Sequence, residues 1–156
     1  MHEKVYIAVV VQKQVQSQKA GVIFSINPST NNEKEMVIEG AFGRGEVVVS
    51  GAVTPDEYVL DKEKLSIKNK IIGKQDWLLT LDINLGYTVR KNVPEEKKQE
   101  QKLSDFEIRK LAEITKKIEA HYGSPQDIEY AIDGPNIYIV QTRPITTLKK
   151  KASNVK

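Results

Sequence analysis

The chain has 156 residues, of which 39% are hydrophobic and 29% charged, a balance typical of a soluble globular domain with its own core. The absence of cysteine excludes disulfides and thiolate metal sites, and no apolar run reaches the roughly 18 residues of a membrane span. The net charge is +3, from 24 basic and 21 acidic residues with interspersed signs, so the composition does not indicate nucleic-acid binding.

The first elements expected along the chain are strands. Residues 1–4 lack the apolar core of a signal peptide, so we expect a cytoplasmic protein. The apolar, β-branched run 5–12 predicts a strand buried on both faces, and residues 21–26 and 35–42 predict two more. Residues 27–34 are rich in Asn, Pro, Ser and Thr, which is typical of a loop.

A glycine pair, Gly43 and Gly45, follows the third predicted strand. Glycine permits close backbone approaches, so the pair is compatible with a phosphate-binding loop, although a simple turn also explains it. The side chain of Arg44, between the two glycines, could add a phosphate contact or project into solvent, and we favour solvent. Four shorter strands are then expected at 58–60, 65–72, 76–83 and 87–93, followed by a charged, mobile surface loop over 93–102.

One main helix is expected, at about residues 105–122. Ser104 and Glu107 form a capping-box pattern at its start, and Gly123 marks its end. An apolar stripe at helical spacing indicates that this helix packs against a sheet. The stripe consists of Ile108, Leu111, Ile114, Ile118 and Tyr122.

The last element is a predicted β-hairpin, in which a Gly134-Pro135 turn joins two apolar runs. Because side chains alternate between the faces of a strand, Glu129 on one strand and Gln141 and Arg143 on the other would converge on one surface. Carboxylate and amide oxygens are hard ligands for Mg²⁺, and a guanidinium can grip a phosphate, so this trio suits a metal-bound polyphosphate. A charged, solvated edge hairpin is the alternative interpretation.

The order of strands, helix and strands predicts an α+β fold, with a largely antiparallel sheet and the one main helix packed on it. We expect a single domain over residues 1–148. The remaining residues, 149–156, are polar and basic and predict a disordered tail.

Several segments, in this order, resemble the nucleotide-binding domain of the phosphoenolpyruvate synthase and pyruvate phosphate dikinase family, which rifampicin phosphotransferases share. The resemblance runs over about residues 5–146 and implies an ATP-grasp fold, of which this chain resembles the second lobe, entered through the hinge strand. The matching segments are residues 7–12, 20–25, 27–28, 43–46, 50–58, 121–123, 125–126, 127–131 and 141–144.

The resemblance implies ATP and Mg²⁺ as cofactors. Gln12 and the backbone of residues 13–15, which include Gln14 and Val15, would border the adenine. The family often has Met at the position of Gln14, a departure that would alter the adenine pocket but leave backbone hydrogen bonds in place. Without the resemblance, these residues would be interpreted as a solvated loop.

The resemblance also implies roles for the hairpin trio. Glu129 and Gln141 match the positions that coordinate Mg²⁺ between the ATP phosphates. Arg143 matches the catalytic position that holds the terminal phosphates and stabilises charge during transfer. Where the family usually has Gly-Leu-Gly-Glu, this chain has Arg44 as the second residue.

In the complete enzyme of this family, ATP would phosphorylate a histidine on another domain, releasing AMP and phosphate, and the histidine would pass its phosphate to pyruvate. We expect the family's first lobe and its phosphohistidine domain to lie outside this chain, in a longer parent or in separate subunits. The chain is thus interpreted as an ATP-binding portion of a phosphotransferase that is inactive alone.

There are two alternatives. The chain could be a rifampicin-phosphotransferase-like lobe, or it could be a non-catalytic binding or assembly module that keeps the fold. The surface that would meet the first lobe also favours a homo-oligomer, because large apolar patches seldom stay exposed.

Overall fold

The computed structural model describes residues 4–146. Its strands are β1 (Lys19–Phe24), β2 (Glu35–Phe42), β3 (Asp56–Asp61), β4 (Ile67–Ile71), β5 (Trp77–Asp82), β6 (Tyr87–Asn92), β7 (Gln126–Asp133) and β8 (Asn136–Pro144). Its helices are α1 (Glu46–Val49), the short 3₁₀ helix η1 (Glu95–Lys97) and α2 (Asp105–Tyr122). The predicted tail 149–156 and the predicted domain end at residue 148 lie outside the described residues.

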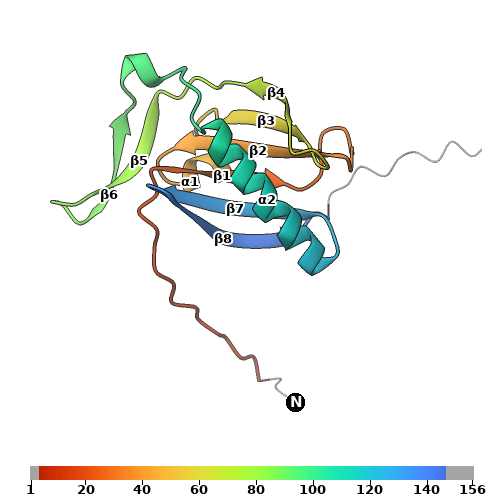
Figure 1. The fold of residues 1–156 in the computed structure, drawn as a ribbon. Helices are drawn as coiled ribbons and strands as arrows, with labels where there is room; N and C mark the ends of the chain where they lie inside the picture. Colours follow the sequence, from red (N-terminus) through yellow and green to blue (C-terminus); the bar gives the residue numbers. More distant parts are fainter. Residues whose placement is uncertain (1–3, 147–156) are drawn as a thin grey trace, which may run out of the picture.

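Six strands form one sheet in the order β4-β3-β2-β1-β7-β8, and every neighbouring pair is antiparallel. Strands β5 and β6 pair separately and project from one end of this sheet (Figure 1). Within residues 4–146, the predicted mostly antiparallel sheet with one main helix is therefore confirmed. None of the helices in this range is long and apolar enough to cross a membrane.

Helix α2 begins and ends as predicted. The Ser104 hydroxyl accepts a hydrogen bond from the Glu107 backbone N–H at 3.1 Å, and the Glu107 carboxylate accepts one from the Ser104 N–H at 2.8 Å. Gly123 ends the helix in the left-handed conformation, with φ of 68°. Tyr122, the last residue of the predicted apolar stripe, is exposed because the final turn extends past the edge of the sheet (Figure 1).

The sheet separates two apolar clusters. The larger lies between the sheet and α2, and its fully buried members include Ile23, Ile38, Tyr58, Ile108 and Leu111. The smaller lies on the opposite face, beneath α1, and consists of Val22, Ala41, Val47, Val48 and Val53. Helix α1 has only four residues, too short for helical periodicity to show, and the sequence did not predict it.

The predicted strand over residues 5–12 is wrong. This segment runs away from the sheet as an extended chain (Figure 1), and Val5 and Val11 are 84% and 96% exposed. A buried strand needs partners for its backbone groups and covering layers for its side chains, and no described strand pairs with this segment.

The connector over residues 93–102 differs from the predicted charged surface loop. Its ends, Val93 and Lys102, are buried, and η1 forms between them. The Lys102 ammonium lies 2.7 Å from the Asp56 carboxylate, with both side chains fully enclosed. Asp56, for which the sequence indicated no role, thus anchors this connector to β3.

Candidate functional site

A hollow of about 570 Å³ opens on the face of the sheet opposite α2. Its walls come from the segment before β1, from β1 itself, from the start of α1, and from β7 and β8. Four of the six residues predicted for the site line it: Gln12, Gln14, Val15 and Glu129. The other two, Gln141 and Arg143, do not line the hollow and follow its wall residue Val140 along β8.

The register of the β7–β8 hairpin brings the predicted trio to one face. Glu129 lies directly opposite Gln141, and Asp127 lies directly opposite Arg143. A bulge follows, because Tyr130 pairs with Ile139 and leaves Val140 as the extra residue on β8. Glu129, which lines the hollow, therefore has Gln141 directly opposite it, next to the point where the register shifts.

Arg143 is held in place by a carboxylate. Its Nε donates to the Oδ2 of Asp127 at 2.9 Å, and its Nη2 lies 2.9 Å from the same oxygen. The Arg143 side chain is 68% exposed, whereas that of Asp127 is 15% exposed. The partly buried acid thus fixes the guanidinium at the surface, where its other N–H groups can meet an anion from solvent.

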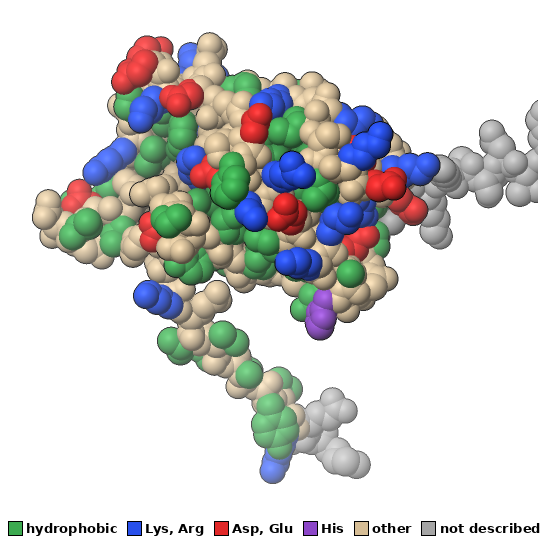
Figure 2. Space-filling model, viewed as in Figure 1, with side chains coloured by type: hydrophobic (Ala, Val, Ile, Leu, Met, Phe, Trp, Pro, Cys, Tyr) green, Lys and Arg blue, Asp and Glu red, His purple; other side chains and the backbone are tan. Residues whose placement is uncertain are grey.

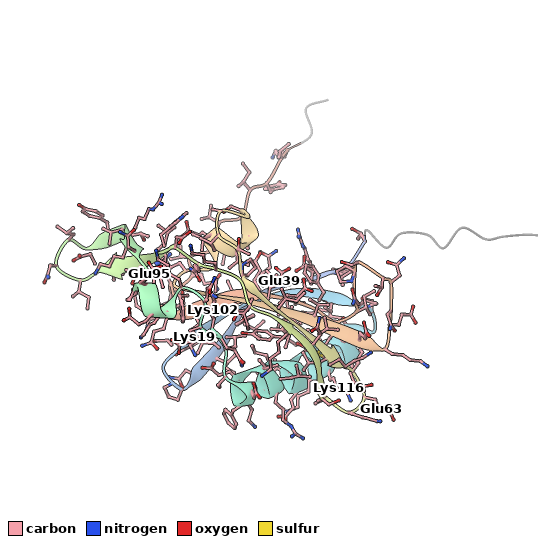
Figure 3. The ribbon with its side chains drawn as sticks, turned by 90° about the horizontal axis from the view of Figure 1, so that it is seen from above. Lys19, Glu39, Glu63, Glu95, Lys102 and Lys116 are labelled. Carbon is pink, nitrogen blue, oxygen red and sulfur yellow. The ribbon has the colours of Figure 1, made fainter. Side chains whose placement is uncertain are left out.

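Carboxylates gather on this face of the sheet. Glu57, Glu39 and Glu129 lie in one row across the strands, with Val22 between the last two. Glu39 points to the side away from α2 (Figure 3). Burial raises the pKa of the Glu39 carboxyl, and the negative charges of Glu57 and Asp127 raise it further. A cation on this face would therefore be electrostatically favoured.

The chemistry of Glu129 and Gln141 fits a hard cation. Adjacent strands present one carboxylate and one amide oxygen, and Mg²⁺ takes oxygen ligands and keeps several waters, so one or two protein ligands are enough. Among residues 4–146, no group of three or more His, Cys, Asp or Glu side chains is arranged to hold a metal ion.

The solvent position that the sequence analysis favoured for Arg44 is wrong. The residue is only 6% exposed and lines the hollow. The reason is that β5 crosses this loop: the Arg44 N–H donates to the Leu79 carbonyl at 2.9 Å. The residue that signals this close approach of β5 is Gly43. Its φ is 85°, and a Cβ there would lie 2.4 Å from the Leu79 oxygen.

The hollow is also lined by Lys13, whose backbone was expected to border the adenine, by Gly45 of the glycine pair, and by Glu46, for which the sequence indicated no role. Ser50, for which no role was derived, is exposed at the end of α1 and does not line it.

Comparisons with known proteins show which proteins the chain resembles. Residues 1–156 match the AMP/ATP-binding domain of pyruvate phosphate dikinase. The chain is 52% identical over 150 residues to a probable phosphoenolpyruvate synthase of Archaeoglobus fulgidus and 48% identical over 159 residues to the phosphoenolpyruvate synthase of Pyrococcus furiosus. It is 38% identical over 153 residues to a rifampicin phosphotransferase of Bacillus subtilis.

The alignments with these three relatives cover 96%, 97% and 94% of this chain, but only 20%, 20% and 17% of the relatives. The chain therefore spans about a fifth of the length of the curated relatives it matches.

Proposed function

The chain belongs to the family of the pyruvate phosphate dikinase AMP/ATP-binding domain, and we propose that it is the second lobe of an ATP-grasp nucleotide site in a phosphoenolpyruvate-synthase-like phosphotransferase. The observation that carries this proposal is that Glu129 lies opposite Gln141 and lines the same hollow as residues 12–15.

In this proposal, Gln12, Gln14 and Val15 border the adenine. Gln12 and Gln14 are exposed and Val15 is half-buried, so the segment can offer both its backbone groups and one apolar side chain to a base. Backbone hydrogen bonds to the adenine do not depend on side-chain identity, which makes Gln14 compatible with this role.

The phosphates would lie over β7 and β8. Glu129 and Gln141 would hold Mg²⁺, which supplies charge neutralisation to bound phosphates. Arg143, fixed by Asp127, would hold the terminal phosphates and stabilise the charge that develops on them during transfer. Positioning and charge stabilisation are the main requirements of phosphoryl transfer, and these side chains can meet both.

The complete reaction needs more than this chain. The hollow is open, and electrostatic stabilisation is weak where phosphates stay in water. We propose that the first lobe closes over this face, and that a phosphohistidine domain, in cis or in trans, carries the phosphate to pyruvate. The exposed apolar residues Val5, Ile7 and Val9 would be covered by that lobe or, without it, by a second copy of the chain.

A rifampicin-phosphotransferase-like lobe is the second candidate, and the 38% identity to the Bacillus subtilis protein supports it. The identities of 48% and 52% to phosphoenolpyruvate synthases favour pyruvate as the final acceptor. A non-catalytic module is the least favoured candidate, because a purely structural role does not need Glu129, Gln141 and Arg143 on one face.

Calorimetric titration with ATP, with and without Mg²⁺, tests the proposal. We expect binding that requires Mg²⁺ and disappears in a Glu129→Ala, Arg143→Ala double variant. The matched control is Glu63→Ala, since Glu63 is exposed in the turn after β3, far from the hollow (Figure 3). Equal binding by the double variant, or no binding by the parent chain at millimolar ATP, would contradict the proposal.

A further inference from the structure

Arg44 is a buried cation whose charge is not balanced within the described chain. Its side chain makes no ion pair with any residue in the range 4–146, and its Nε has no hydrogen-bond partner there, although the residue is only 6% exposed. Arginine stays protonated under all ordinary conditions, so this burial cannot be relieved by loss of a proton.

A buried charge of this kind is unfavourable unless an opposite charge and hydrogen bonds accompany it. The only other buried cation in the described chain, Lys102, follows this rule and pairs with Asp56 at 2.7 Å. Arg44 departs from it, which indicates that the missing acceptor is brought by a ligand.

The position of Arg44 indicates which ligand this is. Arg44 lines the same 570 Å³ hollow as Gln12 and Glu129, but from the opposite wall, at the start of α1. Beside it, Gly45 lacks a side chain, and a Cβ there would approach only the Cβ of Ala20, at 3.4 Å. No side chain therefore projects from position 45 beside Arg44, and a ligand in the hollow can come close to the guanidinium.

We propose that Arg44 is a further nucleotide-binding residue, whose guanidinium contacts the phosphate chain. This inference rests on the proposed nucleotide site and adds a cation on its second wall. A guanidinium binds a phosphate with two parallel hydrogen bonds, and a phosphate brings the negative charge that a neutral base or ribose does not. The nucleotide would thus lie between Arg44 on one wall and Glu129, Gln141 and Arg143 on the other.

A structural alternative is also open to test. Arg44 lines a second hollow, of about 400 Å³, together with Leu78 and Asp133. If the guanidinium turned toward Asp133, its role would be to fix β5 to the sheet, and substitution would affect folding rather than phosphate affinity.

The test compares Arg44→Leu and Arg44→Lys with the parent chain, using MgATP and adenosine as two separate probes in calorimetric titrations. We expect Arg44→Leu to weaken MgATP binding about tenfold or more, since it removes charge-assisted hydrogen bonds, and to leave adenosine binding unchanged. Arg44→Lys keeps the positive charge but lacks the planar guanidinium group, so it should give a smaller loss of MgATP affinity. The control is Arg109→Leu, an exposed arginine on α2 whose loss should change neither affinity.

Thermal unfolding of each variant separates a binding effect from a folding effect. If Arg44→Leu does not fold, the Arg44→Lys variant carries the comparison. Equal weakening of MgATP and adenosine, or no weakening of either, would overturn the inference. Absence of MgATP binding by the parent chain would instead contradict the proposed function itself, so the two failures are distinguishable.

Discussion

Asp56 and Lys102 form an ion pair in which neither side chain is exposed. The Asp56 carboxylate also accepts hydrogen bonds from the Tyr58 hydroxyl at 2.6 Å, from the Gly73 N–H at 2.9 Å and from the Lys102 N–H at 2.7 Å. These bonds satisfy the buried carboxylate and join β3 to the connector that leads into α2. A single charged residue therefore holds together segments 46 positions apart.

Replacing Lys102 by alanine would leave this carboxylate buried without its counter-charge. We expect Lys102→Ala to lower the free energy of unfolding by about 3–5 kcal/mol in urea denaturation. The control is Lys110→Ala, since Lys110 pairs with Glu113 at 3.4 Å on the exposed side of α2 and should contribute about 0–1 kcal/mol. Similar losses of stability for the two variants would show that the buried ion pair stabilises the fold no more than the exposed one.

Glu39 should make stability depend on pH. Burial, together with Glu57 and Asp127, raises its pKa above the ordinary 4.5, so the folded state holds this proton more tightly than the unfolded state. Its contribution to stability is then fully present below the unfolded pKa and is lost as the pH rises through the folded pKa. Glu39→Gln, which stays neutral, should be more stable than the parent chain near neutral pH and equal to it in acid.

Urea denaturation of both proteins at a series of pH values, from roughly 3 to roughly 7, measures this difference. Glu63→Gln, at an exposed position, is the control. A difference between Glu39→Gln and the parent chain that does not change with pH would contradict the account.

The helices and strands that the sequence predicted correctly are those whose own residues mark their ends or turns. The β7–β8 hairpin depends on the turn at Gly134, whose φ is 56°, and α2 depends on Ser104 and Gly123 at its ends. The strand expected over 5–12 was wrong because an apolar run does not specify the neighbour it pairs with. The burial of Arg44 was missed for a related reason, since β5, which covers it, lies more than 30 residues further along the chain.

The capping box of α2 provides a prediction at this scale. Ser104→Ala removes the acceptor of the Glu107 N–H and should lower the free energy of unfolding by about 1 kcal/mol. Guanidinium chloride denaturation measures the change, and Ser66→Ala, in the exposed turn before β4, is the matched control. An unchanged midpoint for Ser104→Ala would mean that the packing of α2 on the sheet makes the cap unnecessary.

For the whole molecule, the two faces of the sheet differ in what covers them. Helix α2 covers one face, and its outer surface carries intermixed positive and negative side chains (Figure 2), as expected of a solvated surface. The other face carries the short α1, part of β5, the open hollow and the row of carboxylates. The proposed nucleotide site therefore lies on the less covered face, where the rest of a longer enzyme would close over it.

A titration of the isotopically labelled chain with MgATP, followed by the NMR shifts of its backbone amides, tests the central claim most directly. We expect the largest shifts at residues 12–15, 44–46, 129 and 140–143, around the hollow on the α1 face. A different hollow of about 520 Å³ lies near the end of α2 and is lined by Lys62, Lys116 and Glu119. Shifts gathered at this hollow near α2, with residues 12–15 and 129 unchanged, would contradict the claim that the nucleotide binds between α1 and the β7–β8 hairpin.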